Sequence, residues 1–133
     1  MKPALPAVAV GAIVFRGEQV LLVRRRRAPS AGLWSFPGGR VRSGELLRAA
    51  CRRELREETG LSLRLGRAVG VFERVSDGYH YLIVDFLAEA PAGARVRAGS
   101  DASRARWFSA SDLRGVRKTP GLLQALARAK LVR

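Results

Sequence analysis

Residues 39–61 read GRVRSGELLRAACRRELREETGL, and this stretch decides the fold. From Leu46 to Thr59 it contains neither glycine nor proline, and its apolar residues recur at helical spacing. We predict a helix over this range, with Ser43 as the N-cap residue and Gly60 just beyond the C-terminal end. The stripe that faces the core is predicted to contain Leu47, Ala49, Ala50, Cys51 and Leu55.

The same stretch concentrates negative charge. The chain has 11 acidic residues, and Glu45, Glu54, Glu57 and Glu58 all fall within this segment. Positions 54, 57 and 58 lie on one face of the predicted helix, where like charges repel. A bound Mg²⁺ or Mn²⁺ is the usual compensation, because these ions prefer carboxylate oxygens. The alternative is a solvated acidic face that is neutralised by neighbouring arginines.

The spacing of Gly39, Glu45, Arg53-Glu54-Leu55, Glu57-Glu58 and Gly60-Leu61 resembles the complete Nudix box at every specified position. The likeness extends to residues 34–39 before the box and to residues 107–108 after it. Membership in the Nudix hydrolase family implies an α/β fold, with a mixed β-sheet sandwiched between α-helices and the box forming a loop, a helix and a loop. It implies a single domain over residues 1–133, similar to small bacterial ADP-ribose pyrophosphatase and MutT-like members.

The resemblance also implies the residues of the site. The cation ligands are then the backbone of Gly39 and the carboxylates of Glu54, Glu57 and Glu58, with Glu45 in support. The catalytic set is Glu57, Glu54, Arg53 and Asp101, in which Arg53 orients a glutamate. A cation lowers the pKa of a bound water, which attacks one phosphorus while a carboxylate acts as general base. The base is a box glutamate or a residue of a later loop such as Asp101, for which the alternative is an ordinary loop aspartate.

Residues beside the box are candidates for holding the rest of the substrate. Phe36, like Trp34, either stacks on a base or ribose or packs in the core beneath the loop. Arg24 or Arg25, at the end of a predicted strand, either contacts a phosphate or lies at a solvated strand end. We interpret Trp107 and Phe108 as core residues of the sheet.

The rest of the chain is predicted to supply strands on both sides of this helix and a closing helix. The predicted strands are Ala7–Phe15, Gln19–Arg24, Leu61–Phe72, Tyr79–Ala88 and Arg106–Phe108. Residues 25–43 and 89–105 are predicted loops, and residues 111–113 one helical turn. The closing helix is predicted over Gly121–Leu131, with Thr119-Pro120 as its N-cap and first residue. Its packing face is predicted to contain Leu122, Leu123, Leu126, Ala127 and Leu131.

Charge and composition set limits on location and partners. The formal net charge is +14, and nearly all the basic residues are arginines scattered along the chain. Binding of an acidic partner is one interpretation, and a compositional bias toward arginine is the other. A single cysteine excludes an internal disulfide framework, and the first residues lack the apolar core of a signal peptide. We expect a cytoplasmic protein that does not bind membranes and is a monomer or homodimer.

Three further polar residues have structural interpretations. His80, the only histidine, lies in a predicted strand and is interpreted as structural. Asp85 alternates with apolar neighbours, which suggests a half-buried partner for an arginine, with a site role as the alternative. Cys51 is interpreted as a buried thiol rather than a nucleophile.

Several functions are compatible with these residues. The leading one is hydrolysis of ADP-ribose or a related nucleotide sugar. The alternatives within the family are a MutT-like nucleoside triphosphate pyrophosphatase and an RNA 5′-end pyrophosphohydrolase. In MutT-like relatives an amide residue near the last helix can read the base, and here Gln124 is the only amide in that region, which argues modestly against tight base selection. A non-catalytic basic module that binds nucleotides or nucleic acid is disfavoured, because all the box glutamates are present.

Overall fold

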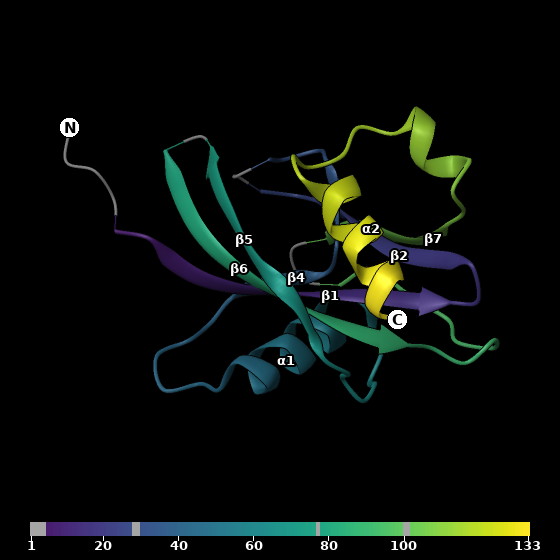
Figure 1. The fold of residues 1–133 in the computed structure, drawn as a ribbon, viewed down its shortest axis with the longest axis horizontal. Coiled ribbons are helices and arrows are strands. Elements are labelled where there is room, and N and C mark those ends of the chain that lie inside the picture. Colours follow the sequence, from purple (N-terminus) through teal and green to yellow (C-terminus); the bar gives the residue numbers. More distant parts are fainter. Residues whose placement is uncertain (1–4, 28–29, 77, 100–101) are drawn as a thin grey trace.

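The computed structural model describes residues 5–27, 30–76, 78–99 and 102–133 (Figure 1). These residues form seven strands, two α-helices and one 3₁₀ turn at Asp112–Gly115. The strands are β1 (Ala7–Arg16), β2 (Gln19–Arg25), β3 (Trp34–Ser35), β4 (Gly38–Arg40), β5 (Ala68–Ser76), β6 (Tyr79–Glu89) and β7 (Ala102–Phe108), and the helices are α1 (Leu47–Thr59) and α2 (Leu122–Val132).

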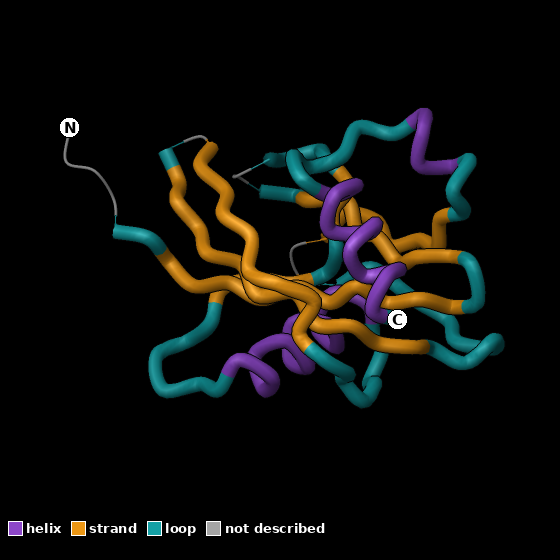
Figure 2. The backbone as a smooth tube through the Cα atoms, viewed as in Figure 1, coloured by secondary structure: helices purple, strands orange, loops and turns teal. Residues whose placement is uncertain are grey.

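The strands form one mixed sheet in the order β3-β2-β1-β6-β5, with β4 also pairing β1 and β7 also pairing β2. The central pair, β1 and β6, is parallel, whereas the other pairings are antiparallel. The two helices lie on opposite sides of the sheet (Figures 1 and 2). The predicted α/β class and the mixed sheet between helices are therefore confirmed.

Alternation along the buried strands gives the molecule two cores, one on each face of the sheet. In β1, Ile13 and Phe15 pack toward α2, while Ala12 and Val14 pack toward α1. From the helices, Leu126 enters the first core, and Ala50, Cys51 and Leu55 enter the second. Helix α1 thus lies over β1, the strand that also pairs with β4, and α2 lies over β5.

The C-terminal end of α1 lies where it was predicted, and the N-terminal end does not. Gly60 adopts φ 79° and its N–H donates to the carbonyl of Arg56, as expected for the residue that ends a helix. Ser43 is not the N-cap, because the structure assigns Leu46 to that position without a side-chain cap. A tight turn accounts for this: the N–H of Glu45 donates to the carbonyl of Arg42, so the helix begins later.

Several predicted boundaries and packing faces were wrong. Residues 60–67 form a loop rather than a strand, and Leu61 and Leu65 fix that loop in the core beside α1. Strand β7 begins at Ala102, inside a predicted loop, because it pairs with β2 as far as Arg25. The short strands β3 and β4 were not predicted. Three residues predicted in the packing faces, Leu47, Leu123 and Leu131, are exposed, and so is Ala127, whereas Ala125 and Ala129 are buried.

Helix α2 begins later than predicted. Thr119 is not its N-cap, since its N–H donates to the carbonyl of Trp34 and holds that segment beside β3. The helix follows Gly121, which has φ 82°. Among the described residues, no helix has the length and apolar character needed to cross a membrane.

Candidate active site

Arg53 is the centre of a charged cluster at the junction of α1 and β4. Its guanidinium donates to both carboxylate oxygens of Glu45, at 2.7 and 2.9 Å. It also donates to Glu54 at 2.7 Å, to Glu57 at 3.4 Å and to the carbonyl of Arg40 at 3.2 Å. The residue is only 9% exposed, so its charge is compensated by these acceptors rather than by water. Arg53 therefore fixes the orientation of three of the predicted site glutamates.

Glu45 is tied to Arg53 more tightly than the other carboxylates. The guanidinium of Arg53 and the backbone N–H of Arg42 hold the pKa of the Glu45 carboxyl at about 2. Since both oxygens accept from Arg53, the structure places Glu45 as a support for that arginine. In this arrangement the Glu45 oxygens contact Arg53, and the predicted role of Glu45 as a cation ligand stays a prediction.

Two glycines of β4 allow the carboxylates of α1 to approach the strand. The N–H of Gly38 donates to Glu58 Oε1 at 2.7 Å, and Glu58 is 5% exposed. A Cβ atom on Gly39 would lie 2.6 Å from the carboxyl carbon of Glu54 and 2.7 and 2.8 Å from its oxygens. Only glycine leaves room for that carboxylate. The absence of a side chain at Gly39 thus forms a recess of backbone and carboxylate oxygens beside the helix.

This set of oxygen donors fits Mg²⁺ or Mn²⁺ in chemistry. Both ions prefer carboxylate and carbonyl oxygens. In this arrangement, however, the described residues hold no group of three acidic, histidine or cysteine side chains positioned to bind a metal ion. Arg53 donates to Glu54 Oε1 and to Glu57 Oε2, and the N–H of Gly38 donates to Glu58 Oε1, so each of these bonds engages one oxygen of its carboxylate.

Two adjoining cavities open beside this cluster. The first, which we call the carboxylate cavity, has a volume of about 360 Å³ and is lined by Arg25, Arg53, Glu54, Glu57 and Glu58, among others. The second, which we call the aromatic cavity, has a volume of about 240 Å³ and is lined by Phe36, Phe72, Tyr81, Asp85 and Leu122, among others. Arg25, Gly38, Gly39, Arg40 and Tyr81 line both cavities, so the two form one continuous surface.

Of the predicted substrate-binding residues, Arg25 and Phe36 lie at these cavities and Arg24 does not. Arg25 lines both cavities, and Phe36 lines the aromatic one while packing against the core. Arg24 is not among the lining residues of either cavity, and its Nε donates to the carbonyl of Gly32 at 3.4 Å. Trp34 is a core residue in edge-to-face contact with Phe108.

Asp101 lies outside the described residues. The backbone just before it is held at the end of α1, where the N–H of Gly99 donates to the carbonyl of Glu58 at 3.1 Å. A Cβ atom on Gly99 would overlap the carbonyl oxygen of Glu57.

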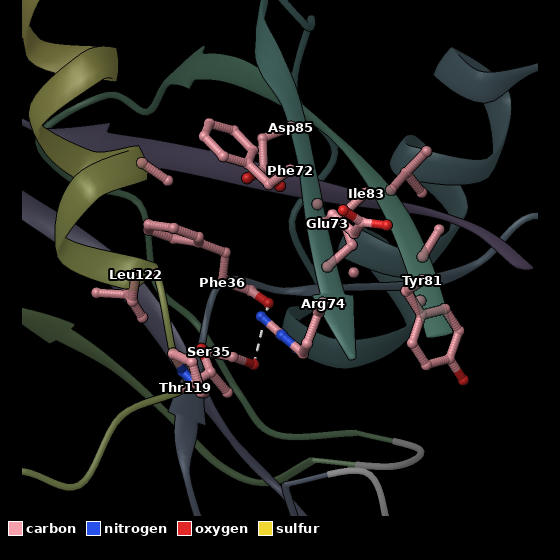
Figure 3. A pocket seen from close by; sticks show the side chains of 18 of the residues that line it. Ser35, Phe36, Phe72, Glu73, Arg74, Tyr81, Ile83, Asp85, Thr119 and Leu122 are labelled. Atoms are coloured by element: carbon pink, nitrogen blue, oxygen red, sulfur yellow. Dashed lines mark hydrogen bonds between the residues drawn. The ribbon is translucent and has the colours of Figure 1, made fainter. Parts of the chain in front are cut away.

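Asp85, for which a site role was the alternative interpretation, lines the aromatic cavity, and so does Arg74, which was not predicted as a site residue. Asp85 is 5% exposed on β6, and Arg74 lies on the neighbouring strand β5 (Figure 3). Burial raises the pKa of the Asp85 carboxyl to about 7, although the charge of Arg74 partly offsets this. The expected pairing with an arginine is electrostatic only, because no hydrogen bond or ion pair joins Asp85 to any described residue. A lone acid inside an apolar strand was the signal that marked Asp85.

The other residues singled out in the sequence, Cys51, His80, Trp107 and Phe108, line neither cavity. Cys51 is buried, lies 3.4 Å from the carbonyl oxygen of Gly11, and has its pKa raised to about 12 by burial. His80 Nε2 lies 2.6 Å from Glu73 Oε2 on the adjacent strand. Phe108 is part of the core on the α2 side of the sheet, and Trp107 packs against the core on the α1 side.

Replacing Gly39 by alanine is expected to displace the Glu54 carboxylate, because the new methyl group would occupy its position. We expect turnover to fall by about 10–100-fold, since small displacements of a catalytic group have effects of that size. The free energy of unfolding should change by less than about 1 kcal/mol, because the obstructing group is the end of a flexible side chain. The measurements are kcat and urea denaturation. Gly93→Ala is the matched control, since a Cβ there meets nothing within 4 Å; equal kcat in the two variants would contradict the placement of Glu54.

Replacing Asp85 by asparagine is expected to stabilise the fold in a pH-dependent way. The pKa of Asp85 rises from 3.8 to about 7 in the folded chain. Between pH 3.8 and about 7 the folded state therefore binds more protons than the unfolded state. The stability of the wild type therefore falls as pH rises through this window, with Arg74, on β5, as the charge that most opposes the loss. Asp85→Asn lacks this titration. Above pH 7 its free energy of unfolding should exceed that of the wild type by on the order of 2–4 kcal/mol, and at pH 4 the two should be nearly equal. Urea denaturation at both pH values checks this, and a pH-independent difference would refute it.

Comparisons with known proteins agree with this architecture. A family model described as the NUDIX domain matches residues 5–128. The chain is 35% identical over 111 residues to the ADP-ribose pyrophosphatase of Methanocaldococcus jannaschii, an alignment that covers 81% of this chain and 64% of that protein. It is 33% identical over 99 residues to the putative 8-oxo-dGTP diphosphatase of Bacillus subtilis, which covers 73% of this chain and 62% of that protein.

The likeness extends to three dimensions. A crystal structure of a MutT NUDIX hydrolase from Burkholderia pseudomallei has 31% sequence identity and a TM-score of 0.84, covering 94% of this chain and 98% of that one. The matched region thus spans less than two thirds of the two curated relatives but nearly all of the solved structure. The family model covers most of the sequence, and the chain belongs to the NUDIX family.

Proposed function

We propose that the chain hydrolyses the pyrophosphate linkage of a nucleoside diphosphate joined to a second group, in a reaction that requires a divalent cation. The observation that carries this is the continuity of the two cavities, one walled by glutamates and arginines and the other by aromatic rings. A substrate with a charged diphosphate next to a flat base has matching chemistry. ADP-ribose is the leading candidate, supported by the 35% identical relative named ADP-ribose pyrophosphatase.

In this proposal the box residues have separate tasks. Glu54, Glu57, Glu58 and the carbonyl of Gly39 would hold Mg²⁺ or Mn²⁺, and Glu45 would act through Arg53. The cation, when bound, neutralises the diphosphate and lowers the pKa of water.

The carboxylates and the nearby arginine then handle the water and the substrate. Glu57 or Glu54 accepts the proton of the attacking water, with Asp101 as the alternative base. As the new P–O bond forms, the bridging P–O bond breaks, and the leaving phosphate keeps the bonding electrons. Arg25 donates to phosphate oxygens at the boundary of the two cavities.

A second candidate substrate is a nucleoside triphosphate, from which the chain would release pyrophosphate. The observation that favours it is the position of Thr119 and Gln124, which line the aromatic cavity where a base would lie. The amide of Gln124 offers both a donor and an acceptor for base recognition. The relative named putative 8-oxo-dGTP diphosphatase supports this alternative.

The test is product release by the full chain, which we expect to act as a single cytoplasmic domain over residues 1–133. The panel contains ADP-ribose, other nucleotide sugars, dinucleoside polyphosphates, NADH, and common and oxidised nucleoside triphosphates, each with Mg²⁺ and with Mn²⁺. Release of AMP and ribose phosphate from ADP-ribose would support the leading candidate, whereas pyrophosphate released from a triphosphate would support the second. No turnover of any member would overturn the proposal.

A further inference from the structure

The aromatic cavity is lined by Asp85 and Arg74, and within the described part of the chain neither Asp85 nor Arg74 Nε has a hydrogen-bond partner. The Asp85 side chain is 5% exposed, lines this cavity, and has no hydrogen bond or ion pair with any described residue. On the adjacent strand, Arg74 Nε is buried and also has no hydrogen-bond partner. Buried polar groups in folded proteins are nearly always paired, so two such groups lining one cavity indicate that a ligand completes them.

The fold makes room for the Asp85 carboxylate at a specific position. Residue 85 on β6 is opposite Gly11 on β1, and a Cβ atom on Gly11 would overlap Asp85 Oδ1. The antiparallel pairing of β1 with β4 places Gly11 beside Gly38, and Gly38 lines the carboxylate cavity. The acid is therefore accommodated by a glycine rather than pushed out of the sheet, at the cost of an unfavourable burial.

The surroundings of Asp85 are suited to a flat ring. Phe72 projects from β5 close to Asp85, and Phe36 and Leu122 line the facing side of the cavity (Figure 3). Aromatic and aliphatic walls bind the faces of a heterocycle, while the few polar groups in such a site fix its edge. A carboxylate accepts hydrogen bonds and a guanidinium donates them. The ring that fits therefore carries an N–H donor next to an acceptor.

We propose that Asp85 and Arg74 recognise the edge of a purine base, with Asp85 accepting from an amino or imino N–H and Arg74 donating to the neighbouring ring nitrogen or carbonyl oxygen. This assignment rests on the proposed function, since it places the base in the aromatic cavity and the phosphates in the carboxylate cavity. The Watson–Crick edges of adenine (N6–H beside N1) and of guanine (N1–H beside O6) both provide a donor next to an acceptor. Asp85 would then determine base specificity without touching the reacting phosphorus.

The test measures equilibrium binding of nucleoside monophosphates by the full chain in metal-free buffer. The probes are AMP, GMP, CMP, ribose 5-phosphate and the 5′-monophosphate of unsubstituted purine riboside, which lacks the N–H donor at the base edge. The wild type should bind AMP or GMP about 10–100-fold more tightly than the unsubstituted purine nucleotide, because that analogue leaves Asp85 unpaired. In Asp85→Leu this ratio should fall to near one, while the affinity for ribose 5-phosphate stays unchanged. Glu18→Gln, at a residue whose side chain is 98% exposed, is the control.

The outcomes separate this inference from the proposed function. Equal affinity of the wild type for AMP, GMP and the unsubstituted analogue would overturn it, and so would tightest binding of CMP. Equal loss of all ligands in Asp85→Leu, ribose 5-phosphate included, would also overturn it, since that result indicates a structural role. Asp85→Asn provides a second variant if the leucine variant does not fold, and should shift preference toward adenine, whose edge matches an amide. A chain that recognises purines as described but hydrolyses no substrate would refute the proposed function and leave the base site supported.

Discussion

Replacing Glu57 by glutamine is expected to lower kcat by about 10²–10⁴-fold, the range for loss of a group that takes part in proton transfer. Glutamine keeps the size of the side chain but removes its charge and its ability to accept a proton. The Glu57 side chain is 35% exposed and makes only long ion pairs, at 3.4 Å to Arg53 and 3.8 Å to Arg42. Its loss should therefore leave the fold intact, and the measured defect should be chemical.

The controls for Glu57→Gln are an exposed acid and the binding of product. Glu18→Gln makes the same chemical change at a side chain that is 98% exposed and should leave kcat unchanged. Product affinity without metal should be close to that of the wild type in both variants, because Glu57 lines the carboxylate cavity and not the aromatic cavity. A Glu57→Gln protein with wild-type turnover would exclude Glu57 from catalysis and weaken the case for the whole box.

Local spacing predicted the parts of the site that lie close together in sequence. Glu54, Glu57 and Glu58 share a helix face because a helix repeats every 3.6 residues, and Gly60 ends that helix for a local steric reason. The bidentate contact between Arg53 and Glu45 also lies within the box, although its geometry depends on the turn at residues 42–45. These features required no knowledge of the rest of the chain.

The parts that prediction missed or left open depend on contacts between distant segments. Asp85 lies in the site because β6 runs parallel to β1, which places it beside Gly11. Arg74 joins them only through the β5–β6 pairing. The boundary of β5 was wrong because Leu61 and Leu65 are apolar anchors of a loop, and a burial pattern alone does not separate such anchors from a strand. Long-range pairing thus determines the aromatic cavity, whereas local sequence determines the carboxylate cavity.

Replacing Arg53 by lysine is expected to reduce both stability and turnover, although the charge is retained. A lysine has one ammonium group in place of the planar fork that reaches Glu45, Glu54, Glu57 and the carbonyl of Arg40 together. Leaving part of a buried ionic cluster unpaired should lower the free energy of unfolding by about 2–4 kcal/mol. The freed carboxylates should lose their orientation, and kcat should fall by about 10–100-fold.

The division between kcat and KM distinguishes a positioning role for Arg53 from direct substrate binding. Since all the contacts of Arg53 are with its own chain, KM in Arg53→Lys should stay within about threefold of the wild type while kcat falls. Arg52→Lys makes the same change at the exposed neighbouring position and should alter neither kcat nor stability. A rise in KM with unchanged kcat would instead mean that Arg53 contacts the substrate. Unchanged kcat and KM in a destabilised variant would restrict Arg53 to the fold, because the carboxylates would then hold their catalytic geometry without it.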